Sequence, residues 1–183
     1  MDTISILVAV VAVCALVAWY LSYSAARLDR LHARVEGALT ALDAQLVRRA
    51  EATLELANSG VLDPASALLL AGAASESLEA ADEQHTGREA IESDLTESLE
   101  LALSPAALAQ IAEHGAVGGA ALGRVKAANQ RVQLARRFHN DAVIDVRRVR
   151  SKRVVRWFHL AGHAELPSTV EFADELPALE RSG

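Results

Sequence analysis

The sequence predicts an all-α protein in which an N-terminal transmembrane helix continues into an antiparallel four-helix bundle, ordered long, short, short, long. Three observations predict this fold. The chain opens with an apolar run, it contains two long stretches with apolar residues three and four apart, and no segment shows a strand pattern. Aromatic residues make up only 4% of the 183 residues, which suits helices packed through Ala, Leu and Val. We expect an anchor over residues 1–23, a bundle over 24–162 and a flexible acidic tail over 163–183.

The apolar run is the predicted membrane anchor. Residues 4–21 are apolar apart from Ser5, which gives roughly 27 Å of helix, close to a hydrocarbon core of about 30 Å. Aromatic residues suited to the membrane interface stand at its end: Trp19, Tyr20 and Tyr23. Cys14 is the only cysteine, which excludes an internal disulfide and a multi-thiolate zinc site.

The charges around this run predict its orientation. No Lys or Arg precedes it, whereas a secretory signal peptide carries such residues there, so an uncleaved anchor is favoured over a cleaved signal peptide. Arg27, Arg30 and Arg34 all follow the run, and positive residues mark the cytoplasmic side of a span. We therefore expect a single-pass cell-membrane protein with its N-terminus outside and its bundle in the cytoplasm.

The anchor and the first soluble helix are expected to be continuous, since only Gly37 interrupts the helical pattern before Asn58. Asn58-Ser59-Gly60 then supplies helix-stop residues. The inward stripe of this helix follows spacings of three and four and consists of Leu28, Leu31, Val35, Ala38, Leu42, Gln45 and Arg49.

Capping signals place the two short helices and an extra piece. Asp63-Pro64 combines an N-cap with an N1 proline and opens the second helix. Thr86-Gly87-Arg88-Glu89 has the form of a capping box and opens the third. Ser104-Pro105 repeats the first signal and begins a short piece that reaches about Glu113.

The last long helix follows a glycine-rich break at residues 115–119 and is expected to run to about Leu160. Its predicted inner face consists of Leu122, Val125, Ala128, Val132, Ala135, His139, Ala142, Val146 and Val149. We expect His139 to be a satisfied core histidine, because it lies on this apolar stripe.

Two strings in the long helices resemble a known family. The first is Asp43-Ala44-Gln45-Leu46-Val47-Arg48-Arg49, an Asp-x-Gln-Leu-x-Arg-Arg pattern. The second begins Asn129-Gln130-Arg131-Val132-Gln133-Leu134-Ala135-Arg136-Arg137 and continues to Val143. Together they resemble the first and last soluble helices of LemA family proteins. The resemblance implies architecture, membrane attachment and a partner such as a membrane protease, but no reaction.

The resemblance is divergent in the middle of the chain. Residues 50–55 contain neither the Pro nor the Asn that usually follow the Arg-Arg pair in the family. The two Tyr-Asn pairs of the family read Tyr23-Ser24 and His139-Asn140, and Asn129 replaces a common Glu. A site that the family shares at these positions is therefore expected to be altered here.

The polar members of the two strings are candidates for pairing inside the bundle: Asp43, Gln45, Arg49, Arg131, Arg136 and Asn140. Gln45 and Arg49 lie on the inward stripe, and we expect Asp43 to pair with an arginine of the last helix. Such a pair fixes helix register without any catalytic role. A binding surface built from the same residues is the alternative.

The end of the last helix is a candidate membrane-surface contact. It combines positive and apolar side chains, as interfacial segments do: Arg147, Arg148, Arg150, Lys152, Arg153, Arg156, Trp157 and Phe158. We expect these residues to meet an anionic leaflet. The alternative is a solvated basic helix end that pairs with the acidic tail.

No catalytic, cofactor or metal site is predicted, since no zinc-protease motif, nucleophile elbow or phosphate loop occurs. His159 and His163 stand four apart, so the alternative is a metal-binding enzyme or accessory subunit. A net charge of −6 and few aromatic residues argue against nucleic-acid binding. The sequence thus predicts a non-enzymatic adaptor that presents its bundle to a membrane or cytoplasmic protein.

Overall fold

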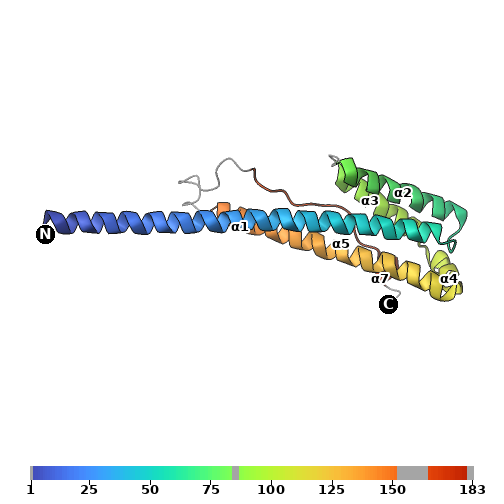
Figure 1. Cartoon of the computed structure of the whole chain (residues 1–183). Coiled ribbons are helices and arrows are strands. Elements are labelled where there is room, and N and C mark those ends of the chain that lie inside the picture. Colours follow the sequence, from blue (N-terminus) through green and yellow to red (C-terminus); the bar gives the residue numbers. More distant parts are fainter. Residues whose placement is uncertain (1, 84–86, 152–164, 181–183) are drawn as a thin grey trace. The chain divides into compact units, whose positions relative to one another are not determined.

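The computed structural model describes residues 2–83, 87–151 and 165–180. Within these ranges the chain is mostly helical and contains no strand, which confirms the all-α prediction (Figure 1). The helices are α1 (Thr3–Asn58), α2 (Pro64–Glu83), α3 (Arg88–Ala102), α4 (Pro105–Glu113), α5 (Gly115–Arg150) and α7 (Pro177–Glu180).

The chain divides into two compact units. Unit 1 comprises Met1–Gly37 and Asn140–Thr169, and unit 2 comprises Ala38–His139 and Val170–Gly183. The first part of α1 and the last part of α5 therefore belong to unit 1. Unit 2 contains the rest of both helices together with α2, α3, α4 and α7.

The first part of α1 is apolar and exposed. Leu7, Val11 and Trp19 are each 60% exposed or more, and none of the most apolar window of the helix is buried. By length and composition this helix can cross a membrane, and it is the single helix in the described part of the chain that can do so. The predicted anchor thus corresponds to one unburied apolar helix near the N-terminus.

Unit 1 has a small core where α1 meets the end of α5. Leu28 and Val35 of α1 are buried with a row of small apolar residues of α5: Ala142, Val143, Val146 and Val149. An exposed ion pair between Arg34 and Asp145, at 3.4 Å, lies beside this core. Both helices bury the stripe that their apolar periodicity predicts.

Two of the predicted N-caps of unit 2 are confirmed. The Oδ1 atom of Asp63 accepts hydrogen bonds from the backbone N–H groups of Ala65 and Ser66, and α2 begins at Pro64. The hydroxyl of Ser104 accepts the backbone N–H of Ala107, and α4 begins directly after it. These local signals fix where α2 and α4 begin.

The start of α3 differs from the predicted capping box. The helix begins at Arg88, and its N-cap is Gly87, which has φ +108° and no side-chain capping bond. Thr86 lies outside the described residues. The Glu89 carboxylate, which a capping box would turn back to Thr86, instead accepts the backbone N–H of Glu171 at 2.9 Å. A contact distant in sequence therefore uses this side chain.

The turn from α4 to α5 depends on one glycine. A Cβ atom at Gly118 would overlap the carbonyl oxygen of Ile111, so only glycine permits this approach of α5 to α4. Gly119 and Gly123 have open space around them. Gly115 has φ +57° and continues the chain from α4 into α5.

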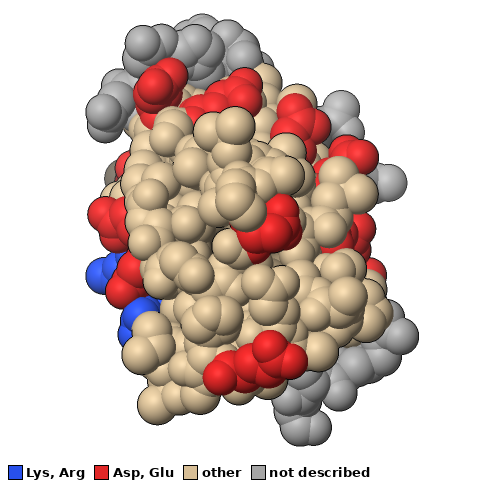
Figure 2. Space-filling view, turned by 90° about the vertical axis from the view of Figure 1, so that its right-hand side faces the viewer, with Lys and Arg blue, Asp and Glu red and all other residues tan. Residues whose placement is uncertain are grey.

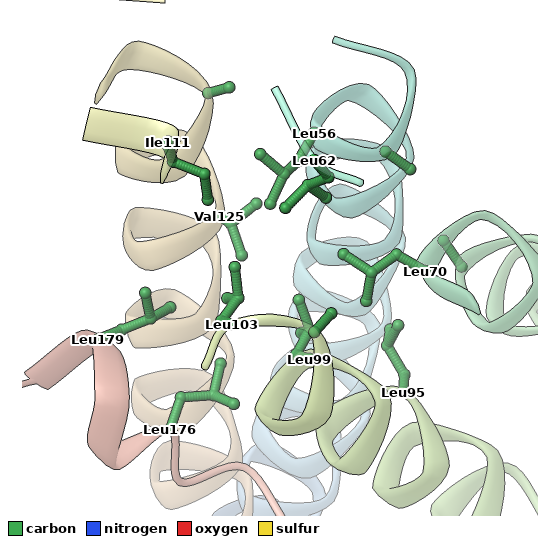
Figure 3. Close-up of a cluster of buried hydrophobic side chains, with 14 of the residues drawn as sticks. Leu56, Leu62, Leu70, Leu95, Leu99, Leu103, Ile111, Val125, Leu176 and Leu179 are labelled. Carbon is green, nitrogen blue, oxygen red and sulfur yellow. The ribbon is translucent and has the colours of Figure 1, made fainter. Parts of the chain in front are cut away.

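The main core of unit 2 is aliphatic. It joins Leu56 of α1, Leu70 of α2, Leu99 of α3, Ile111 of α4 and Val125 of α5. Figure 3 shows these side chains together with two that come from the C-terminal segment, Leu176 and Leu179. The helices α2 and α3 also pack against each other (Figure 1). All six helices that contribute to the unit therefore share one hydrophobic cluster.

The face of the molecule shown in Figure 2 is mostly uncharged. Scattered acidic side chains interrupt it, and few basic ones are seen. Exposed apolar residues occur on α2, α3 and α5, with Leu68, Leu101 and Val117 each more than 60% exposed.

The acidic segment after residue 164, expected to be a flexible tail, is packed against unit 2 along residues 170–179. Asp174, Leu176 and Leu179 are each 2% exposed. The leucines join the main core, and the carboxylate meets an arginine of α5. The prediction weighed only the polar composition of the segment, whereas its apolar residues and its partners decide its placement.

Candidate functional site

A buried ion pair lies at the centre of unit 2. The Nη2 atom of Arg49 lies 2.7 Å from the Oε2 atom of Glu92, and both side chains are fully buried. The same nitrogen donates to the Glu92 carbonyl oxygen at 2.9 Å. Nη1 donates to the Thr96 hydroxyl at 3.0 Å and to the side-chain oxygen of Asn129 at 3.2 Å. One guanidinium of α1 thus joins α3 to α5.

Two further polar side chains contact the carboxylate of Glu92. The Ser77 hydroxyl of α2 donates to its other oxygen at 2.8 Å, and the Nε atom of Arg88 lies 3.5 Å from it. Arg88 also pairs with Asp43 of α1 at 3.2 Å. Two arginines therefore face two carboxylates, and the fully buried charges of Arg49 and Glu92 compensate each other.

The C-terminal segment lies extended beside this centre and alternates between two environments. Val170, Phe172, Asp174 and Leu176 are buried or half-buried, whereas residues 171, 173, 175 and 177 are exposed. A period of two residues is the side-chain repeat of an extended chain. The segment therefore presents every second side chain to the helices.

Side chains of α3 bind the main chain of the segment. The Glu89 carboxylate accepts the N–H of Glu171 at 2.9 Å, and the Ser93 hydroxyl accepts the N–H of Ala173 at 3.1 Å. The Thr96 hydroxyl donates to the carbonyl oxygen of Ala173 at 2.7 Å. Positions 89, 93 and 96 lie on one face of α3, so they form a polar row along the segment.

Side chains of α5 bind the segment from the other side. The amides of Asn129 and Gln133 donate to the carbonyl oxygen of Asp174 at 2.8 and 2.7 Å. The guanidinium of Arg136 holds both carboxylate oxygens of Asp174, at 2.7 and 3.0 Å. The hydrogen bond to Asp174 raises the pKa of Arg136 above its usual value, against the opposing effect of burial. A more exposed contact joins Arg136 to Glu171 at 3.3 Å.

The ring of Phe172 contacts two guanidinium groups. The ring centroid lies 5.8 Å from the central carbon of Arg49 and 5.6 Å from that of Arg136. Both distances suit cation–π attraction. Phe172 therefore connects the buried ion pair with the charged contact at Asp174.

We call the channel between α3 and α5 that receives residues 170–176 the segment groove. The segment does not fill it completely. An open pocket of about 650 Å³ remains along the segment, and its walls include Ser93, Glu97 and Glu100 of α3 and Arg136 of α5. The groove thus combines bound main chain, a charged anchor and free space.

The residues predicted to pair inside the bundle lie in different places. Arg49 and Arg136 lie on the same ring of Phe172. The partner of Asp43 is Arg88 of α3, not an arginine of the last helix as expected. Gln45 and Arg131 line a shallow, mainly apolar pocket on α1 and α5. Asn140 belongs to unit 1 and is half-buried.

The predicted membrane-surface residues are described only in part. Arg147 and Arg150 donate to the carbonyl oxygens of Pro167 and Glu165, at 3.0 and 2.9 Å, and Arg148 is exposed. Five of the set lie outside the described residues: Lys152, Arg153, Arg156, Trp157 and Phe158.

The histidines of the proposed metal alternative, His159 and His163, also lie outside the described residues. Within residues 2–83, 87–151 and 165–180, no group of three or more His, Cys, Asp or Glu side chains is arranged to hold a metal ion. His139 is buried on the inner stripe of α5, as its position predicts.

Sequence reasoning missed most of the groove. Glu92, Asn129 and Asp174 were not singled out as partners of the two arginines. One signal was available, because Val170, Phe172 and Leu176 alternate with polar or small residues at the two-residue spacing of an extended segment.

Comparisons with known proteins do not name this fold or this site. No protein family model, no curated protein and no solved structure matches the chain.

Proposed function

We propose that this protein is a non-enzymatic, membrane-anchored adaptor of the LemA type, with an antiparallel four-helix bundle at the cytoplasmic face of a bacterial membrane. One observation carries the proposal. The helix α1 bears an exposed apolar stretch at its start, and its later residues Leu42 and Leu56 are buried in unit 2. Such a helix is suited to tether a folded helical unit to a bilayer.

Contacts between the two family-like strings support the resemblance. Arg49 of the first string donates to Asn129 of the second at 3.2 Å, and Leu42 and Leu46 pack with Val132. Asn129 occupies the place where the family commonly has Glu. Here the carboxylate that compensates Arg49 comes from Glu92 of α3 instead. The middle of the chain, which diverges from the family, thus supplies through Glu92 the negative charge that Asn129 of the last helix does not carry.

The basic end of α5 supports a second contact with the membrane. Arg147 and Arg148 are exposed and Arg150 is half-buried, so positive charge is concentrated at this end of the helix and is suited to anionic headgroups. A chain that begins at Leu28 should still bind anionic vesicles and not neutral ones. Binding should weaken with salt and when Arg147, Arg148 and Arg150 are replaced by Glu. Equal binding to neutral vesicles would contradict this contact.

Orientation and partner are tested separately. The positive charges that follow the span favour a cytoplasmic bundle. An enzyme that is active only outside the cytoplasm, fused after Gly183, should be silent, and activity would reverse the orientation. Capture of the full-length chain in mild detergent, read by mass spectrometry, should return a membrane or cytoplasmic protein such as a membrane protease. A Leu42→Asp chain, with its unit 2 core disrupted, is the control that should lose that protein.

A further inference from the structure

Residues 170–176 are held in the way that an extended peptide is held by a receptor. Four of their main-chain groups bond to side chains of α3 and α5, and none of these contacts depends on the identity of the segment's own side chains. Recognition of the main chain gives affinity for any extended segment of suitable direction. The segment groove is therefore not limited to one sequence by these bonds.

Three positions of the segment supply selectivity. Phe172 lies on two guanidinium groups, Asp174 binds Arg136 through both oxygens, and Leu176 enters the hydrophobic core. Bidentate contact with arginine is specific for a carboxylate of the right geometry. The groove thus selects an aromatic residue, an acid and a leucine, each two residues apart.

The segment groove is more stable with a bound segment than without one, which favours exchange of one bound segment for another. Removal of the segment would leave the Asn129 amide and the Arg136 guanidinium without the acceptors that Asp174 now provides. A polar group that is shielded from water and loses its partner destabilises the empty groove. A second peptide of the same pattern restores all the groove's bonds. The open pocket beside the segment offers room for its approach.

We propose that the segment groove is a binding surface for an extended acidic segment of another protein, with the pattern Phe-x-Asp-x-Leu, and that residues 170–176 are the internal ligand which this partner displaces. The inference rests on the proposed adaptor function and names the chemistry of its partner. Charge complementarity supports the choice, because Arg136 of the groove pairs with both acidic residues on this part of the bound segment, Glu171 and Asp174.

Competition sets the expected affinities. A segment on the same chain acts at an effective concentration on the order of mM, so it masks the groove from a free peptide. A weakened internal segment should expose the groove. The test is the fluorescence anisotropy of a labelled peptide that is added to the full-length chain in detergent. The peptide has the sequence of residues 168–180, Ser-Thr-Val-Glu-Phe-Ala-Asp-Glu-Leu-Pro-Ala-Leu-Glu.

The decisive variant is Asp174→Arg, which alters the internal segment and leaves every groove side chain native. It should bind the labelled peptide at least tenfold more tightly than the unaltered chain. Glu175→Arg is the matched control, since the same charge change falls on the exposed neighbour, and it should bind as weakly as the unaltered chain. If Asp174→Arg fails to fold, Phe172→Ala opens the segment without a new charge and should show the same gain.

The peptide itself is varied to test selectivity. Replacement of its Phe by Ala, or of its Asp by Asn, should weaken binding at least tenfold. The proposal is overturned if no folded variant binds the peptide more tightly than the unaltered chain, or if the Phe-free peptide binds equally well. It is also overturned if light scattering shows that the opened chain dimerises by exchanging segments and takes no peptide. None of these outcomes touches the reporter fusion or the capture experiment, so the two proposals fail separately.

Discussion

The change Glu92→Gln is expected to destabilise the protein far more than Glu55→Gln. Glu92 is fully buried, and it accepts hydrogen bonds from Arg49 at 2.7 Å and from Ser77 at 2.8 Å. Glu55 pairs with Arg124 at 2.8 Å, but about half of each side chain is exposed. The two pairs have nearly the same length, so burial is what separates them.

The expected magnitudes follow from this difference in burial. Glutamine keeps the shape of Glu92 but leaves the Arg49 guanidinium without its carboxylate, and loss of one partner of a buried pair costs about 3–5 kcal/mol. An exposed pair contributes only about 0.2–1 kcal/mol because water screens it. Since a domain is stable by about 5–15 kcal/mol, the first change is severe. At about 2–4 °C per kcal/mol, Tm should fall by roughly 10 °C.

Thermal unfolding of the full-length chain in detergent, followed by far-ultraviolet circular dichroism, measures both variants. A double variant, Arg49→Met with Glu92→Leu, should lose less stability than Glu92→Gln, because it removes both charges and fills their space with apolar atoms. Equal losses for Glu92→Gln and Glu55→Gln would refute the reasoning. A double variant less stable than the single one would refute it as well.

Three further predictions follow from unit 2. Gly118→Ala should cost about 1–3 kcal/mol, because its Cβ would overlap the Ile111 carbonyl oxygen, and a lower urea midpoint would report this loss. Leu42→Asp should unfold unit 2, since it places an unpaired charge at a position 1% exposed; retained helical circular dichroism and Tm would contradict the assignment of faces. The start of α2 should weaken in acid. Hydrogen bonds from the side chain and backbone of Ser66 hold the pKa of Asp63 below its usual 3.8, so this stabilisation is present above pH 3.8 and is lost as pH falls through the lower, folded-state pKa. Acid unfolding of Asp63→Asn, which still caps the helix, should lack this contribution.

The sequence predicted helix boundaries well where local chemistry sets them. The end of α1 at Asn58, the start of α2 at Pro64 and the extent of α4 from Pro105 to Glu113 all follow from caps, prolines and glycines. The start of α3 was less well predicted, because Gly87 begins that helix and Glu89 bonds to the distant residue Glu171. Local signals fail where a long-range partner competes for the same side chain.

Apolar periodicity predicted the buried faces but not the polar partners on them. Arg49 lies on the predicted stripe of α1 and is fully buried. Its partners Glu92 and Asn129 are 43 and 80 residues away, on helices whose facing sides no local pattern specifies. The same limit explains Asp43, whose partner is Arg88. A stripe shows which residues face inward, whereas the pairing depends on which helices are neighbours.

The acidic segment shows how composition and pattern can disagree. Its charge and prolines favour a loose tail. In an extended chain, however, Phe172, Asp174 and Leu176 lie on the same side, and all three are buried or half-buried. Burial of a lone carboxylate is costly, but Arg136 supplies two hydrogen bonds to it. The segment is held because its apolar and charged residues share one face.

Arg49 links the core of unit 2 with the segment groove. Its guanidinium bonds to Glu92, Thr96 and Asn129 and also lies on the ring of Phe172. Thr96 and Asn129 in turn bond to the main chain of the segment. An occupant of the groove therefore completes the same network that holds the helices in register. Since a ligand that binds only the folded state adds to stability, a peptide that replaces the internal segment should also stabilise the core. The residues that build the fold are thus the ones that would recognise a partner.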